Sequence, residues 1–503
     1  MLAEVLISIA FVLLLYHQWE KRDIYKLGKQ LNSGIRTLPL LGHGYLFIGN
    51  TRMKAFETLG RDAISKENGL SSWWNGSYLL TMIAEPETAE LVLKTCLEKD
   101  DIVEMLKPYI GNGSIFAPVS IWRPRRKVLV PIFSVKNLKY FLRIFAKQSG
   151  ILAQELKKTA DNGPMSIFQY MTTYTMDAVS TLGYKMGAQK DPNHPFLTAI
   201  VIGMTLAAER VCQPWLHSDL VYTKLPIYTK LMTMKKYLWD FINELIKAKQ
   251  EEMKLNKDKQ EHDETSEEIC PITFLEALIK LSGGDKGYTN TEIIEELMVI
   301  LIAGNDTSAA GSSFVTVMLS RHPDVQEKIY EELQEVLGDS DREVTYEDLP
   351  RLKYLDAVIK ESLRLYPPVP VIVRKVQKHI VLPSGIKLVP GTGVAINIWA
   401  LHRNPRYWGH DAEEFRPERF FDALPKHPAA FIPFSHGVRN CAGYQYAMMS
   451  MKTVISTLVR KFRILPAITP NSEHPKYPPL RLGFDITMKD EDNYQIVIEP
   501  RRQ

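Results

Sequence analysis

The sequence predicts a mainly α-helical fold with a smaller β region. Helical hydrophobic periodicity runs through most of residues 167–246 and again through residues 290–320. Short apolar runs bounded by Pro and Gly turns, such as residues 394–398, predict strands of only a few residues. Together these patterns indicate that helices form most of the molecule.

The composition is that of a globular protein with a large apolar core. Of the 503 residues, 45% are hydrophobic and 24% are charged. The net charge of +4 is too small to indicate nucleic-acid binding. The four cysteines (Cys96, Cys212, Cys270 and Cys441) lie far apart and form no CxxC pair, which predicts reduced thiols on the cytosolic side.

Residues 2–16 are almost wholly apolar, and three interpretations compete: a cleaved signal, a short membrane helix or a buried helix. No basic residue precedes the run, and no small-residue cleavage site clearly follows it. Four basic residues come after it: Lys21, Arg22, Lys26 and Lys29. Positive charge on that side keeps the rest of the chain cytoplasmic.

These features predict three parts of the chain. We expect an uncleaved N-terminal membrane anchor at residues 1–20, in which Trp19 lies at the membrane interface. A basic linker at residues 21–36 and one large globular part at residues 37–503 follow it.

The first predicted elements of the globular part are a strand at residues 77–83 and a helix that begins at Pro86, a favourable first-turn residue. Residues 103–118 form an irregular apolar segment. The next helix begins near Trp122, and Arg126, four residues later, lies on the same helix face.

The long helix at residues 290–320 begins with a capping box, Thr289 followed by Glu292. A glycine in a helix centre costs about 1 kcal/mol relative to alanine, so Gly304 requires a reason. A flat cofactor pressed against the helix is one, and a local opening of the helix is another. Asp306 and Thr307 place a carboxylate and a hydroxyl next to each other, a pair that can relay protons.

Residues 349–366 are amphipathic, and Glu361 and Arg364 lie on one face of the predicted helix. Residues 369–373 precede Arg374, and strands are expected at 379–382, 386–389 and 394–398. The tail, residues 482–500, predicts two further short strands.

Cys441 lies in a glycine-bearing loop directly before an amphipathic run at residues 444–462. A thiol at the start of a helix is close to the positive helix end, which predicts a lowered pKa and thiolate character. Gly437 and Gly443 allow a sharp turn and a close approach to a flat ligand. Thiolate is a strong iron ligand, although a lone cysteine in a turn is more often a buried apolar residue.

The pattern Phe434-x-x-Gly437-x-Arg439-x-Cys441-x-Gly443 resembles the haem-binding loop of cytochrome P450 enzymes. The resemblance covers nearly the whole chain and implies a single large haem-containing domain. It implies haem b as the cofactor, with iron ligated by Cys441. The other residues that it places at the haem are Phe434, Gly437, Arg439, Trp122, Arg126 and Arg374.

The same resemblance assigns roles elsewhere in the chain. Asp306 and Thr307 match the acid and threonine of the oxygen-activating helix and are the expected catalytic residues. Glu361, Arg364 and Arg419 match a structural network that fixes the haem loop. Ala303 stands where many animal fatty-acid ω-hydroxylases carry a glutamate that esterifies the haem, so we expect acid solvent to extract the haem.

The function that this resemblance implies is a haem-thiolate monooxygenase of the animal microsomal ω-hydroxylase clan, with an arthropod branch expected. The expected partners are NADPH-cytochrome P450 reductase, optionally cytochrome b5, O2, a small apolar substrate and the lipid of the endoplasmic reticulum membrane. Two alternatives are a reductase-independent isomerase or dehydratase and a non-catalytic haem or lipid carrier. The intact Asp306–Thr307 pair argues against both.

Overall fold

The computed structural model describes residues 16, 19–160, 162–180, 187–260, 273–282, 287–422, 425, 427–468 and 477–501. Most of the predicted membrane anchor, residues 1–20, therefore lies outside the described residues, as does Cys270.

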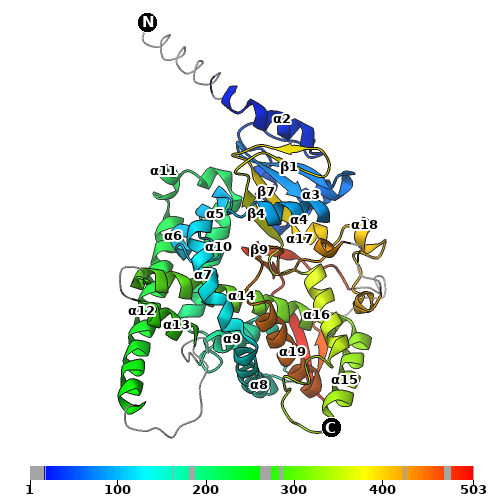
Figure 1. Cartoon of the computed structure of the whole chain (residues 1–503). Helices are drawn as coiled ribbons and strands as arrows, with labels where there is room; N and C mark the ends of the chain where they lie inside the picture. The colour runs from blue at the N-terminus through cyan, green and yellow to red at the C-terminus, as the bar shows by residue number, and fades with distance from the viewer. Residues whose placement is uncertain are drawn as a thin grey trace.

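Helices form most of the fold, as predicted, and strands form a smaller part (Figure 1). The longer helices are α3 (Arg52–Ser65), α8 (Val135–Lys157), α9 (Ile167–Ser180), α10 (Pro195–Cys212), α12 (Pro226–Gln260), α14 (Asn290–Arg321), α15 (Pro323–Leu337), α16 (Lys353–Leu365) and α19 (Tyr444–Lys461). Shorter helices include α4 (Pro86–Thr95), α6 (Lys107–Ile110), α7 (Val119–Leu129) and α11 (Asp219–Tyr222).

Helix α14 runs through the middle of the molecule, and α9, α16 and α19 pack against it (Figure 1). Its predicted capping box is present, because Thr289 and Glu292 bond each other's backbone N–H groups. Nearly all of its residues after Glu292 are buried. A helix that is covered on every side is expected to be largely apolar, so its buried carboxylates Glu295, Glu296 and Asp306 need polar partners.

The main sheet has the strand order β1–β2–β7–β4: β1 (Leu70–Asn75), β2 (Tyr78–Ile83), β7 (Gly393–Asn397) and β4 (Val371–Lys375). Strands β2 and β7 are parallel, with Thr81 opposite Val394, and the other pairs are antiparallel. The strand predictions at 77–83 and 394–398 are confirmed within a residue at each end. Strand β1 was not predicted.

The smaller sheets hold the remaining strands: β3 (Met165–Ser166), β11 (Gln495–Pro500) and β8 (Phe462–Pro466) in one, β9 (Leu482–Asp485) with β10 (Thr487–Asp490), and β5 (Ile380–Val381) with β6 (Lys387–Leu388). The C-terminal tail thus has three strands where two were predicted. Strands β9 and β10 are joined at Ile486, which has a positive φ of 66°.

The predicted basic linker contains a helix, α2 (Arg22–Leu31), which packs on the main sheet. Leu27 and Leu31 are buried, and the ring of Tyr25 stacks on Trp74 with centroids 5.6 Å apart. Within the described ranges, one helix, α10, is long and apolar enough to cross a membrane, but 56% of its apolar window is buried, as in a core helix.

Candidate functional site

The loop that carries Cys441 is a tight turn that is closed by a backbone hydrogen bond between Cys441 and Phe434. The N–H of Cys441 donates to the carbonyl of Phe434 at 2.9 Å, and helix α19 begins three residues after the thiol, with Gly443 as its N-cap. Gly437 has a φ of +74°, and a Cβ there would lie 2.9 Å from the carbonyl oxygen of Leu93. Only glycine suits that conformation and that approach. Gly443 has an ordinary φ of −90°, so it is not required for the turn.

The thiol of Cys441 is exposed, yet it lies deep among protein atoms. Burial raises its pKa, while a hydrogen bond from Gly443 and the charge of Arg126 oppose the rise. The prediction of a lowered pKa is therefore wrong for the protein chain alone, because desolvation outweighs the helix end. Coordination by a metal would reverse the balance, since it deprotonates a thiol. The sulfur therefore remains accessible to a ligand although many protein atoms surround it.

Arg439 fastens this loop to the two segments before helix α7. Its guanidinium donates to the backbone carbonyls of Leu97 at 2.8 Å and Ala117 at 2.8 Å. Its Cζ lies 4.7 Å from the ring centroid of Trp122, on α7. The structure thus brings together Arg439 and Trp122, two of the residues predicted to contact the haem.

Arg126, one turn after Trp122 on α7, reaches the residue next to the thiol. It donates to the backbone carbonyl and to the side-chain Oδ1 of Asn440, each at 2.8 Å. Burial lowers the pKa of Arg126, and Cys441 opposes the shift. The predicted Trp122–Arg126 face is therefore directed at the Cys441 loop.

Arg374 lies on β4 and is 1% exposed. It donates to the carbonyl of Val373 at 3.0 Å, but its Nε is buried without a hydrogen-bond partner. Burial lowers the pKa of Arg374 to about 10, and the nearby charge of Arg439 adds to the effect. Burial likewise lowers the pKa of Arg439 to about 10, against the opposing charge of Glu98.

A third cation, Lys99, joins Arg374 and Arg439. Its pKa is lowered well below the usual value by burial and then by these two arginines. In the described part of the chain, no carboxylate lies within 4.0 Å of Lys99, Arg126, Arg374 or Arg439. Arg374 and Arg439 are buried and Lys99 and Arg126 are half-buried, and cations removed from solvent need anionic partners. The cluster therefore fits a group that brings two carboxylates, as haem does, beside the Cys441 thiol.

Lys99 was not predicted as a site residue. It is a lysine between Glu98 and Asp100 in a charged stretch, and the sequence there predicts a solvent-exposed side chain. Only the fold brings it next to Arg374, 275 positions later.

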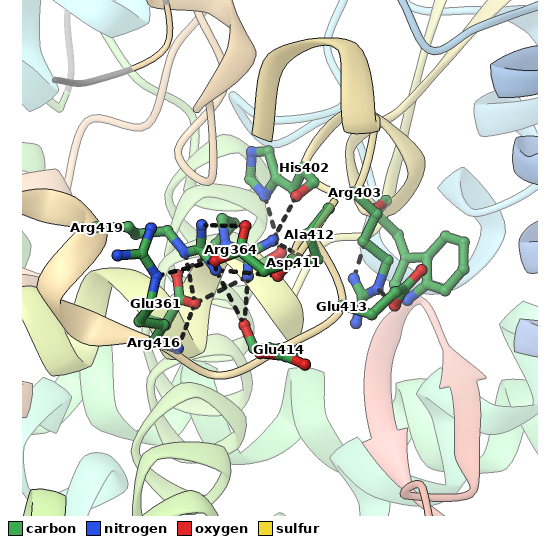
Figure 2. Close-up of polar contacts among 11 residues, drawn as sticks. Glu361, Arg364, His402, Arg403, Asp411, Ala412, Glu413, Glu414, Arg416 and Arg419 are labelled. Atoms are coloured by element: carbon green, nitrogen blue, oxygen red, sulfur yellow. Dashed lines mark hydrogen bonds and ion pairs between the residues drawn. The ribbon is translucent and has the colours of Figure 1, made fainter. Parts of the chain in front are cut away.

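The structure also brings Glu361, Arg364 and Arg419 together (Figure 2). Arg364 donates to both carboxylate oxygens of Glu361, at 2.7 and 2.8 Å, and Arg419 donates to Oε1 at 2.9 Å. The side chains of Glu361 and Arg364 are fully buried. A bidentate Arg–carboxylate pair of this kind is stiff and directional.

The network extends beyond the three predicted residues. Asp411 accepts from Arg416 at 2.9 Å and from Arg419 at 3.2 Å, and Arg416 donates its backbone N–H to Glu361 (Figure 2). Arg364 also donates to the backbone carbonyls of His402 and Ala412. These added partners hold the segment after α16 in one arrangement.

The polar residues in the middle of α14 have separate partners. Thr307 Oγ1 donates to the carbonyl of Ala303 at 2.6 Å. The carboxylate of Asp306, which is 6% exposed, accepts from Thr487 Oγ1 and from Lys489 Nζ, both on β10. Sequence reasoning missed both partners, because nothing in the sequence relates β10 to α14.

Packing gives Gly304 a further reason beside the two that the sequence suggested. A Cβ at this position would lie 2.8 Å from Cγ2 of Val179 on α9. The side chain is therefore absent because α9 crosses α14 closely there.

Comparisons with known proteins agree with this arrangement. The family model described as Cytochrome P450 matches residues 34–489. Cytochrome P450 4V2 of Homo sapiens is 33% identical over 439 residues, 85% of this chain and 83% of that protein. Cytochrome P450 4d2 of Drosophila melanogaster is 30% identical over 512 residues, 99% of both chains. Cytochrome P450 4c21 of Blattella germanica is 31% identical over 465 residues, 90% of both.

Proposed function

This chain belongs to the cytochrome P450 family and is a haem-thiolate monooxygenase, and from this premise we propose that Cys441 ligates the iron and that the substrate is a small apolar molecule. The observation that carries the proposal is the Cys441 thiol, which lies deep in the protein but is uncovered, near the buried cations Arg374 and Arg439, for which the described residues provide no carboxylate within 4.0 Å.

The proposal assigns a role to the side chains around Cys441. Haem, when bound, supplies the iron at which O2 is bound and cleaved, and thiolate ligation favours that cleavage. Arg439, Arg374, Lys99 and Arg126 are the residues that would hold the two haem carboxylates, by charge-assisted hydrogen bonds. Phe434 packs edge to face on Tyr444, with centroids 4.7 Å apart, and shields the sulfur from water.

Thr307 and Asp306 handle protons. The hydroxyl of Thr307 can rotate away from the carbonyl of Ala303 and bond a water instead, since a hydroxyl both donates and accepts. Asp306 is the neighbouring carboxylate and the second member of the expected proton-handling pair. Glu361, Arg364 and Arg419 touch no reacting atom in this scheme. They hold the segment that precedes the Cys441 loop.

The electrons come from NADPH through NADPH-cytochrome P450 reductase, with cytochrome b5 as an optional second donor. The substrate is a fatty acid, hormone, odorant or xenobiotic compound held near the iron by apolar contacts, so that proximity selects the carbon that is oxidised.

We assign the protein to the endoplasmic reticulum membrane, with the catalytic domain on the cytosolic side. Exposed apolar side chains support this: Leu40 is 94%, Leu220 73% and Trp215 41% exposed. Pro214 packs on Gly44, where a Cβ would lie 2.5 Å from its Cγ, so the α10–α11 connection lies beside the N-terminal segment. An apolar surface next to the expected anchor suits a lipid surface.

The test is reconstitution with the reductase. We expect reductase-dependent NADPH consumption and the carbon monoxide difference spectrum of a thiolate-ligated haem. A thiolate spectrum without reductase-dependent turnover would favour an isomerase or dehydratase, and neither signal would favour a carrier. Washing membranes with sodium carbonate tests the anchor, because release of the full-length protein would contradict a spanning helix.

A further inference from the structure

Asp306 is held by a cation that lies far away in the sequence. Its Oδ1 accepts from Lys489 Nζ, and its Oδ2 accepts from the hydroxyl of Thr487. Both donors lie on β10, one of the two strands of the β9–β10 hairpin. Both oxygens of the carboxylate are thus occupied by donors that point from the same strand.

Lys489 is itself fixed by several contacts. Its Nζ lies 4.5 Å from the ring centroid of Phe168 on α9, a cation–π arrangement. Its backbone is paired with Gly483 of β9. The side chain of Lys489 is 18% exposed and that of Asp306 is 8% exposed, so the ion pair is largely removed from solvent.

Other titratable groups near this pair do not replace Lys489. Burial raises the pKa of the Tyr494 phenol, and the charge of Asp306 adds to the effect. Asp490 and Asp485 also face Tyr494, and Asp485 is paired with Arg52. Within the part of the chain that the structure describes, Lys489 is the cation that pairs with Asp306.

The consequence follows from the energetics of buried charge. A buried carboxylate that loses its cation either takes up a proton or leaves its place, because the uncompensated charge is costly. In the present arrangement both carboxylate oxygens of Asp306 accept hydrogen bonds, one from Lys489 and one from Thr487. It is also turned toward β10, while the neighbouring Thr307 hydroxyl bonds the carbonyl of Ala303.

We propose that Lys489 is a positioning residue for proton handling: it keeps the Asp306 carboxylate ionised and in one orientation, with Thr487 as the second donor. The proposal rests on the proposed role of Asp306 and Thr307. In this scheme the β9–β10 hairpin and the proton-handling segment of α14 act as one unit.

The first test measures where the electrons go in the reconstituted holoenzyme, with dodecanoic acid as the probe compound. Electrons that fail to reach product appear as hydrogen peroxide: NADPH, H⁺ and O2 give NADP⁺ and H2O2. We expect Lys489→Met to raise the peroxide formed per NADPH several-fold. Lys489→Arg retains the charge and is expected to stay near the native ratio. The carbon monoxide spectrum checks that both variants bind haem normally.

The second test needs no turnover, so it separates this proposal from the function proposed above. Infrared spectroscopy detects the C=O stretch of a protonated carboxylic acid. We expect Lys489→Met to show an added band of this kind that is absent from the native protein, from Lys489→Arg and from the double variant Lys489→Met/Asp306→Asn. The proposal is overturned if Lys489→Met leaves both the peroxide ratio and the infrared spectrum unchanged, or if Lys489→Arg changes them as much as Lys489→Met does.

Discussion

His402 accepts a hydrogen bond on Nε2 from the backbone N–H of Ile432, at 2.9 Å. Its Nδ1 lies 3.2 Å from the carbonyl oxygen of Arg364, so the ring carries its proton there and donates it. His402 is fully buried and sits between the Glu361 network and the segment that leads into the Cys441 loop (Figure 2). One neutral tautomer therefore connects the end of helix α16 to residue 432, nine positions before the thiol.

Substitutions of His402 can distinguish the effect of its two hydrogen bonds from the effect of its packing volume. His402→Phe leaves the Ile432 N–H and the Arg364 carbonyl buried without partners, at about 1–3 kcal/mol each. We expect a loss of about 2–6 kcal/mol in the free energy of unfolding, together with a lower haem content. His402→Gln can donate and accept, so it should retain most of both. Equal losses in the two variants, measured by chemical denaturation and haem assay, would contradict the hydrogen-bond account.

The same histidine predicts how stability depends on pH. Burial and the charge of Arg364 lower the pKa of His402 to about 3, whereas an unfolded histidine titrates near 6.5. Between these values the unfolded chain binds one more proton than the folded chain, so stability falls as the pH falls. His402→Gln removes this contribution, which makes the unfolding free energy less dependent on pH by up to about 1.4 kcal/mol per pH unit. Denaturation curves from pH 7 downward test this, and parallel pH profiles would refute it.

Glu361 is predicted to be indispensable for haem incorporation. Glu361→Ala leaves Arg364 and Arg419 as buried cations without their shared carboxylate, and breaking a buried ion pair costs about 3–5 kcal/mol. We expect the purified variant to contain no haem. Lys353→Ala, at an exposed position on the same helix, is the matched control and should contain normal haem. A Glu361→Ala protein with full haem content would show that the network is dispensable.

Lys99 and Arg374 are predicted to retain the haem rather than to stabilise the chain. Lys99→Met or Arg374→Met removes one charge-assisted contact, worth about 1.5–3 kcal/mol, so haem transfer to apomyoglobin should be faster by roughly 10- to 100-fold. The apoprotein should not be destabilised, because each substitution also relieves repulsion among buried cations. Lys94→Met, at an exposed position on α4, is the control. Unchanged haem transfer would remove these two residues from the site.

Local patterns predicted the elements whose signals are contained in one stretch of sequence. The Thr289–Glu292 capping box marks the start of α14 to the residue, and turn residues mark the strands on either side of Pro390. Strand β1 escaped prediction because nearly all of its residues are buried, including Ser71 and Ser72, so the alternation typical of a surface strand is absent.

The residues of the site also differ in whether a local sequence pattern predicts them. The motif around Cys441 and the Glu361–Arg364 spacing are local, and the sequence indicates them directly. The partners of Asp306 come from a strand about 180 residues later, and Lys99 meets Arg374 only through the fold. Gly304 shows a further limit, because one reason for this glycine is Val179 on another helix. Contacts between segments that are distant in the sequence depend on tertiary packing, which the hydrophobic periodicity of one segment does not predict.

The central claim is that the sulfur of Cys441 is the iron ligand, and Cys441→Ser tests it most directly. The variant replaces the thiol with a hydroxyl of similar size, which is a poor iron ligand, so the fold should persist. We expect the thiolate-type carbon monoxide difference spectrum and the reductase-dependent oxidation of substrate to be lost together. If Cys441→Ser still oxidised substrate with electrons from the reductase, the assignment of Cys441 would be wrong.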